Sequence, residues 1–106
     1  MTHYAIANLQ NVNVGPDIVE YLERIDSTLA PYDGHFIIHG NQPEPVEGEW
    51  AGTLIVIAFP DEASAQGWYA SPAYQEILPL RTKNSDGVTM LLAGVDRSHR
   101  ATDVLG

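Results

Sequence analysis

No cysteine occurs among the 106 residues of the sequence. A disulfide framework, a thiolate metal site and a cysteine nucleophile are therefore excluded. Basic residues are also few: 5 Lys and Arg stand against 14 Asp and Glu, and the formal net charge is −9. Proteins bind nucleic acids and anionic membranes through Lys and Arg, so neither is expected as a partner. The excess of acid either keeps the protein in solution or recognises a cationic partner.

Long apolar runs and cofactor-binding motifs are missing as well. The longest apolar run, Leu54–Phe59, is far shorter than the roughly 20 residues of a membrane-spanning helix. The N-terminal segment MTHYAIANLQ has no basic or apolar signal region, so the cytoplasm is the expected compartment. The sequence contains no GxGxxG, P-loop, GxSxG, HExxH or HxH motif. We therefore expect neither a nucleotide cofactor nor a bound metal.

Two helices can be located from apolar spacing and from helix-start signals. The first is expected to begin at Pro16, which suits a first helical position, and to be stopped by Pro31. Its apolar stripe recurs every three or four residues and consists of Ile18, Leu22, Ile25 and Leu29. The second is expected at 62–70, restarts after Ser71-Pro72, and is broken or kinked at Pro79.

Short apolar segments between turn residues predict four strands, at residues 3–9, 35–39, 53–59 and 88–95. Residues 40–52, rich in glycine and proline, are typical of an exposed arm. The order of elements predicts an α+β domain with the ferredoxin-like βαββαβ arrangement at residues 1–96, followed by a polar C-terminal tail at 97–106. In this arrangement a four-stranded antiparallel sheet carries both helices on one face.

Strand 53–59 indicates that the other face of the sheet is also covered. All its residues after Thr53 are apolar, and a strand that is apolar on both sides needs a cover on both sides. Two helices cover only one face. A second copy of the chain is the simplest cover for the other, because twofold homodimers are the commonest soluble oligomers.

Several segments together resemble the domain-of-unknown-function family DUF1330 of the dimeric α+β barrel superfamily. They are DGHFIIHG, VEGEW, the AFP that ends the third strand, and WYASPAYQ followed by Arg81. The resemblance implies a two-subunit barrel in which each subunit contributes one four-stranded sheet. The superfamily includes cofactor-free oxygenases, lactone isomerases, polyketide cyclases and haem-degrading enzymes, whereas the family itself has no general assigned reaction.

The sequence departs from the family pattern in three places. Asp33-Gly34 stands where the family usually has paired glycines, and a turn tolerates this change. Ala58 stands where members often have a glutamate, so any chemistry of that carboxylate is absent or carried by another residue here. His35 and His39 occupy positions that are often arginine, which keeps a basic character but makes it titratable.

The two histidines of strand 35–39 are the candidate catalytic residues. Alternation along a strand places His35, Ile37 and His39 on one face, with the histidine Cα atoms about 13 Å apart at ~3.3 Å per residue. This separation argues against a shared metal ion, whose ligands must converge. Histidine can act as a general acid or base, and His39 is preferred because it lies beside Gly40 at the strand end. The alternative is a hydrogen-bonded histidine at a dimer seam or a strand end.

Aromatic side chains, one arginine and one asparagine are candidate substrate-binding residues. Trp50, Trp68, Tyr69 and Tyr74 can line a pocket for a small apolar or aromatic ligand, or can serve as core and interface packing. Arg81 can hold a substrate carboxylate with two hydrogen bonds, or it can hold a helix end or pair with Glu76 or Asp86. Asn8 can add a polar group from the first strand.

Two functions remain open at this point. The first is a small-molecule enzyme with cofactor-independent acid/base chemistry of the isomerisation, cyclisation or oxygenation type. In it, His39 acts as acid or base and His35 orients or polarises the substrate. The second is a non-catalytic, homodimeric ligand-binding or interaction domain, favoured by Ala58 and by the lack of any strong catalytic motif.

Overall fold

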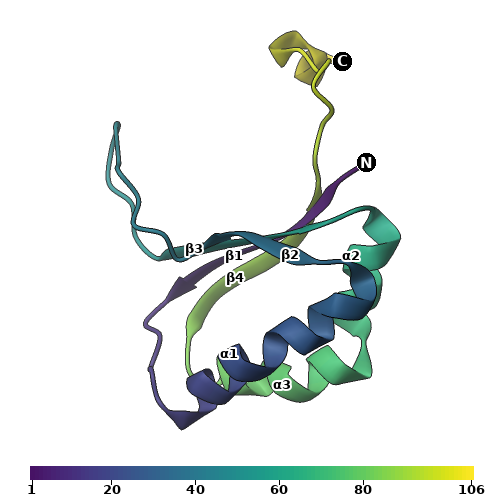
Figure 1. Ribbon diagram of the computed structural model, residues 1–106. Helices are drawn as coiled ribbons and strands as arrows, with labels where there is room; N and C mark the ends of the chain where they lie inside the picture. Colours follow the sequence, from purple (N-terminus) through teal and green to yellow (C-terminus); the bar gives the residue numbers. More distant parts are fainter.

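A four-stranded antiparallel sheet with all the long helices on one of its faces forms the fold (Figure 1). The computed structural model describes residues 1–106. The strands follow the spatial order β2-β3-β1-β4, with bounds β1 His3–Gln10, β2 His35–His39, β3 Thr53–Phe59 and β4 Asp86–Ala93. The helices are α1 Pro16–Leu29, α2 Glu62–Ala70 and α3 Pro72–Thr82, with short 3-10 turns η1 Ala30–Tyr32 and η2 Ala101–Leu105. The expected ferredoxin-like α+β arrangement is confirmed.

The stripe that α1 buries differs from the expected one at a single residue, and Leu29 is buried as expected. Tyr21 is buried together with Ile18 and Ile25, whereas Leu22 is 46% exposed. Positions 21 and 22 both fit helical spacing to Ile18 and Ile25, so local periodicity cannot choose between them. Packing of α1 against α3 and the sheet selects Tyr21 for the core.

The second helical segment is divided at Ser71, as expected. The Asp61 side chain caps α2 by accepting a hydrogen bond from the Ser64 N–H at 2.8 Å, and Ser71 Oγ caps α3 by accepting from the Tyr74 N–H at 3.2 Å. The expected break at Pro79 is wrong, since α3 continues to Thr82. Proline removes one helical hydrogen bond, but Pro79 lies in the last turn, and the Lys83 N–H still closes that turn onto the Pro79 carbonyl.

The edge strand β2 contains a β-bulge directly after Phe36. The extra residue shifts the register, so His39 pairs with Ile55, where unbroken alternation would have paired it with Leu54. Phe36 and His39 therefore lie on the helix-facing side of the sheet, and their rings stack with centroids 4.3 Å apart. The expectation that His35 shares a face with His39 is wrong: His35 lies on the opposite side.

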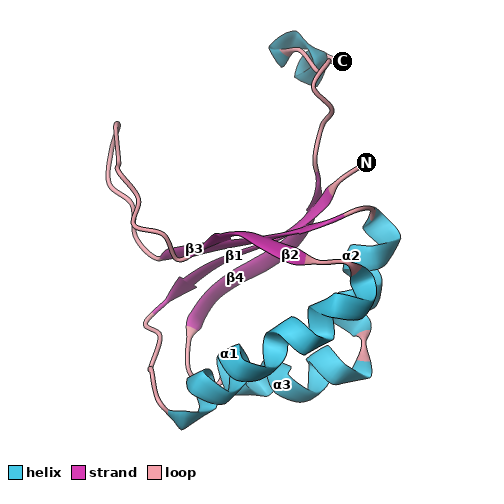
Figure 2. Cartoon of the chain, in the orientation of Figure 1, coloured by secondary structure: helices cyan, strands magenta, loops and turns pink.

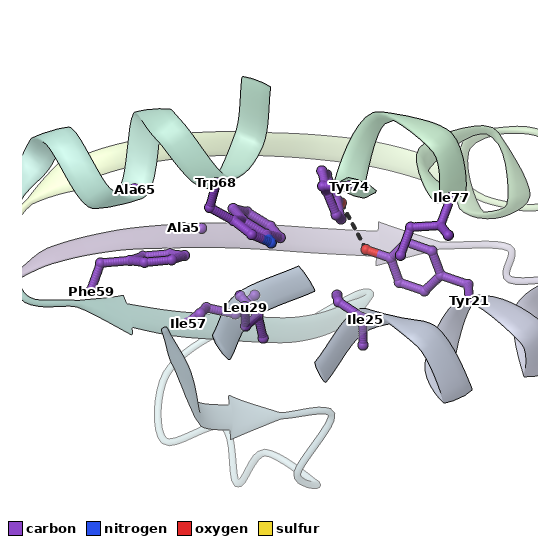
Figure 3. Close-up of a cluster of buried hydrophobic side chains, with 10 residues drawn as sticks. All are labelled: Ala5, Tyr21, Ile25, Leu29, Ile57, Phe59, Ala65, Trp68, Tyr74 and Ile77. Carbon is purple, nitrogen blue, oxygen red and sulfur yellow. Dashed lines mark hydrogen bonds between the residues drawn. The ribbon is translucent and has the colours of Figure 1, made fainter. Parts of the chain in front are cut away.

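The hydrophobic core lies between the sheet and the helices (Figure 3). Its largest fully buried side chains are Trp68, Tyr74, Phe59 and Ile77, each of which contributes about 1.5–3 kcal/mol through burial. The indole N–H of Trp68 donates to Thr28 Oγ1 at 3.0 Å, so this buried polar group is satisfied. Of the 106 residues only 17 are buried, which indicates that the chain leaves much apolar surface uncovered.

Part of the uncovered apolar surface lies on the sheet face turned away from the helices, called here the open face. On β1, β3 and β4 its side chains are Tyr4, Ile6, Asn8, Gln10, Leu54, Val56, Ala58, Asp86, Val88, Met90 and Leu92. Val88, Met90 and Leu92 are 62%, 48% and 48% exposed. Of these eleven side chains only Asp86, at the start of β4, is charged. Val56 and Ala58 are already buried within the single chain, at 7% and 5% exposed.

Two segments extend beyond the open face. Residues 40–52 and the C-terminal segment both project to the side of the sheet opposite the helices (Figures 1 and 2). Because they do not pack on the core, the Cα radius of gyration is 15.1 Å, against about 13 Å expected for a domain of this size. No helix in the structure is both long and apolar enough to cross a membrane.

Candidate functional site

A cavity of about 320 Å³ lies between the helix-facing side of the sheet and helices α1 and α3. Protein interiors are close-packed, so a void of this size needs a local cause. Ala5 and Ala7 provide it, because these small side chains lie on the central strand β1 where larger ones would fill the space. The exposed lining residues mark the opening: Val14, Leu22, His39, Gly40, Thr53 and Thr89.

The lining is apolar and contains no acid. Fifteen of its 20 residues are hydrophobic, and neither Asp nor Glu is among the 20, although the chain has 14 acids. The polar side chains of the lining are Tyr21, His39, Thr53, Trp68, Tyr74, Arg81 and Thr89. The cavity lining therefore contains the positive charge of Arg81 and no negatively charged side chain.

Tyr21 and Tyr74 form a hydrogen-bonded pair in the wall of the cavity. Their hydroxyl oxygens lie 2.8 Å apart, and their rings meet edge to face at 6.2 Å (Figure 3). Burial, reinforced by the neighbouring Tyr74, raises the pKa of Tyr21 far above its ordinary value, and Arg81 opposes this only in part. Tyr21 is therefore a neutral phenol under all physiological conditions.

Arg81 lies beside this pair without a carboxylate partner. Its guanidinium carbon is 5.9 Å from the centre of the Tyr21 ring, and no acid lies within ion-pair distance. Both acids suggested for it have other partners: Glu76 accepts from Arg24 at 2.9 Å and Asp86 accepts from Asn11 at 3.0 Å. Burial disfavours the charged form, but the phenols outweigh it, and the pKa of Arg81 is above its usual value.

His39 contributes the imidazole at the opening. Its position is set by the bulge in β2, by stacking on Phe36 and by the hydrogen bond from its backbone N–H to Asn41 Oδ1 at 3.1 Å. The imidazole itself makes no hydrogen bond within the protein. Both ring nitrogens are therefore free to donate to or accept from a bound molecule.

Four of the eight site residues expected from the sequence line this cavity: His39, Trp68, Tyr74 and Arg81. Trp68 is both a core residue and a wall of the cavity: it is only 2% exposed, and its ring centroid lies 4.1 Å from that of Tyr74, with the two rings tilted by 38°.

The other four lie elsewhere. His35 and Asn8 lie on the open face, where Asn8 Nδ2 donates to the Ala51 carbonyl at 3.5 Å. Trp50 belongs to the projecting arm, and its indole N–H donates to the Gly52 carbonyl at 3.1 Å. Tyr69 packs on the outer side of Trp68 without reaching the cavity.

Three polar lining residues were not expected: Tyr21, Thr53 and Thr89. Tyr21 was detectable, because it is spaced three residues from Ile18 and four from Ile25 on a helix whose stripe was recognised. The two threonines gave no signal, since they are ordinary strand residues that reach the cavity only through their pairing with β1. No group of three or more His, Asp or Glu side chains is arranged to hold a metal ion.

These features define a ferredoxin-like α+β protein with a small, acid-free cavity between sheet and helices. The model of the family "Domain of unknown function (DUF1330)" matches residues 2–95, and the chain belongs to this family. A search of curated protein sequences gives no match.

Solved structures with the same fold confirm the architecture at low sequence identity. RPA0582 of Rhodopseudomonas palustris, a protein of unknown function, is 15% identical, with TM-score 0.64 over 90% of this chain and 82% of its own. The N63A mutant of SnoaB, a cofactor-independent oxygenase of Streptomyces nogalater, is 14% identical, with TM-score 0.63 over 90% of this chain and 94% of its own. A dimeric ferredoxin-like protein of unknown function from Jannaschia sp. CCS1 is 14% identical, with TM-score 0.59 over 85% and 98%.

Proposed function

We propose that this protein is a small-molecule enzyme that performs acid/base chemistry in the cavity without a bound cofactor. The observation that carries the proposal is the meeting, in one apolar cavity, of a free imidazole, a guanidinium without a counter-ion and a phenol pair. Convergent polar groups in a mostly apolar cavity are typical of small-molecule sites. SnoaB, a cofactor-independent oxygenase, shares the fold, which makes such chemistry compatible with this architecture.

The first step is the removal of a proton from a carbon next to a carbonyl group. Neutral His39 accepts that proton, and the negative charge moves onto the carbonyl oxygen. Arg81 and the phenol pair stabilise the developing charge, since preorganised donors are most effective in an apolar site. In an isomerisation, the imidazolium of His39 returns the same proton at another carbon, and the protein is unchanged.

The working form in this proposal is a homodimer joined through the open face. Ten of the eleven side chains that β1, β3 and β4 place there are uncharged, and Val88, Met90 and Leu92 are about half exposed or more. The projecting arm at residues 40–52 and the C-terminal segment extend on this side of the sheet (Figure 1). In a dimer they would contact the second copy. The Jannaschia protein of the same fold is described as dimeric. Burial of a large apolar face is a sufficient driving force for such an association.

The alternative is a homodimeric ligand-binding domain without catalysis. It is favoured by one feature of His39, whose ring has no carboxylate or carbonyl partner to fix its orientation. Catalytic histidines are usually oriented by such a partner.

Proton exchange at carbon distinguishes the two functions. Small ketones and β-keto acids are incubated with the protein in deuterated water, and deuterium uptake is followed by NMR. We expect uptake with wild type and a loss of roughly 10²-fold or more in His39→Gln, with His99→Gln as a control at the exposed chain end. If a molecule binds in the cavity and His39→Gln leaves its exchange rate unchanged, His39 is not the base and the binding-domain alternative is favoured.

A further inference from the structure

We propose that the cavity takes a small apolar or aromatic carboxylate, whose carboxylate group binds Arg81 beside the Tyr21–Tyr74 pair. This inference rests on the proposed function only because it uses the same cavity. It names the class of ligand that the cavity binds, and that class is the same whether the protein is an enzyme or a binding domain.

The charge of the cavity favours an anion. A charged side chain taken partly out of water needs a partner, and Arg81 has no carboxylate within ion-pair distance. The chain offers 14 acids, yet none lines the cavity, and the two acids nearest in sequence pair with Arg24 and Asn11. A ligand carboxylate would supply the missing partner, in the two-hydrogen-bond geometry that arginine offers.

The hydrogen-bonding groups at this end of the cavity are mainly donors. The guanidinium carries N–H donors and no acceptor. Tyr21 and Tyr74 hold two O–H protons, and one hydrogen bond between them uses only one. The remaining O–H has no acceptor among the hydrogen bonds of the protein, so it can donate to a ligand oxygen. Each phenol oxygen can also accept a hydrogen bond, but an ammonium group would meet the positive charge of Arg81.

The size of the cavity limits the apolar part of the ligand. Its volume of about 320 Å³ is at the lower end of the roughly 300–1,000 Å³ found for ligand pockets. Trp68, Ile25 and Ile57 form flat and aliphatic walls around it. One or two rings fit this space better than a long acyl chain.

Isothermal titration with three probes of one shape tests the inference: 2-naphthoate, 2-naphthamide and 2-naphthylmethylammonium. We expect naphthoate to bind at least about tenfold more tightly than the amide, and the ammonium to bind more weakly still. Acetate, which has the charge without the rings, should bind at least about a hundredfold more weakly than naphthoate, because it buries little apolar surface.

Three variants assign the effect to Arg81 and to the cavity. Arg81→Met should abolish the preference for naphthoate over the amide while the amide still binds, and Arg81→Lys should retain part of it. Lys83→Met is the matched control: it removes the same charge two residues away, on an exposed side chain outside the cavity, and should leave the preference unchanged. Ala7→Phe should prevent binding of all three probes by filling the space. Circular dichroism verifies that each variant is folded.

The inference is overturned if naphthoate and the amide bind equally, if Arg81→Met and Lys83→Met have the same effect, or if Ala7→Phe binds naphthoate like wild type. Failure of the proposed function gives a different result. If naphthoate binds through Arg81 but no carbonyl compound exchanges its proton, the ligand class stands and the enzyme reading fails. If exchange depends on His39 while naphthoate and the amide bind equally, the enzyme reading stands and the carboxylate is excluded.

Discussion

The hydroxyl oxygens of Tyr21 and Tyr74 lie 2.8 Å apart although 53 residues separate them in the sequence. This contact joins the middle of α1 to the beginning of α3, and it closes one wall of the cavity (Figure 3). Removal of one hydroxyl leaves the other buried without its partner, whereas removal of both leaves no polar group unsatisfied.

Tyr21→Phe and Tyr74→Phe should each lower the free energy of unfolding by about 1–3 kcal/mol, because each leaves one phenol without its hydrogen bond. The double variant should lose less than the sum of the two single losses, since the coupling between contacting residues is counted twice in that sum. Urea unfolding at neutral pH and fixed protein concentration measures all four proteins. Strict additivity would show that the two hydroxyls do not interact in solution.

Tyr21 should also make the protein sensitive to alkali. Burial, followed by the influence of Tyr74, raises the pKa of Tyr21 above its ordinary value of 10.0. Below that value both the folded and the unfolded chain hold the proton, so the pH has no effect through this group. Above it, the unfolded chain releases the proton while the folded chain keeps it, and the free energy of unfolding falls by up to about 1.4 kcal/mol per pH unit.

Tyr21→Phe lacks this contribution. Its free energy of unfolding should therefore fall less steeply than that of wild type between about pH 9 and about pH 11. Urea titrations at both pH values measure the two slopes. Equal slopes would mean that the phenol of Tyr21 is accessible to solvent in the folded protein.

The fold could be predicted from the sequence because its signals are local. Pro16 and the apolar spacing located α1, and Ser71 with Pro72 located the division between α2 and α3. Strand β4 begins two residues earlier than expected, at Asp86, because its start depends on pairing with Gln10 of β1. Such pairing involves residues distant in sequence and leaves no local pattern.

The candidate site was only partly predictable for the same reason. The bulge that separates His35 from His39 exists because of the register between β2 and β3. The guanidinium of Arg81 is free because Glu76 accepts a hydrogen bond from Arg24, which precedes it by 52 residues in the sequence. The cavity itself is defined by side chains that are small, such as Ala5 and Ala7, and a sequence gives no signal for space left empty between elements.

Met90→Lys should convert a homodimer into a monomer, because it places a charge in the middle of the open face, where Met90 pairs with Ile6. Val19→Lys is the matched control: Val19 is 46% exposed and Met90 48%, but Val19 lies on α1, on the other side of the molecule. Sedimentation equilibrium should give the mass of two 11.6 kDa chains for wild type and for the control, and of one chain for Met90→Lys. A wild-type mass of one chain at micromolar concentration would remove the dimer from the proposal.

Ser71→Ala should weaken both stability and ligand binding. Ser71 is 6% exposed; its Oγ accepts from the Tyr74 N–H at 3.2 Å and donates to the Trp68 carbonyl at 2.7 Å. Loss of such a helix cap costs about 1 kcal/mol of unfolding free energy. Because Tyr74 lies in the first turn of the helix that carries Arg81, fraying of that turn should also weaken naphthoate binding by roughly three- to tenfold. Thermal melts and titration measure the two effects, and Asp61→Ala, which uncaps α2 instead, should leave the binding unchanged. Equal weakening of binding in both variants would mean that general stability, rather than the position of Tyr74, controls the site.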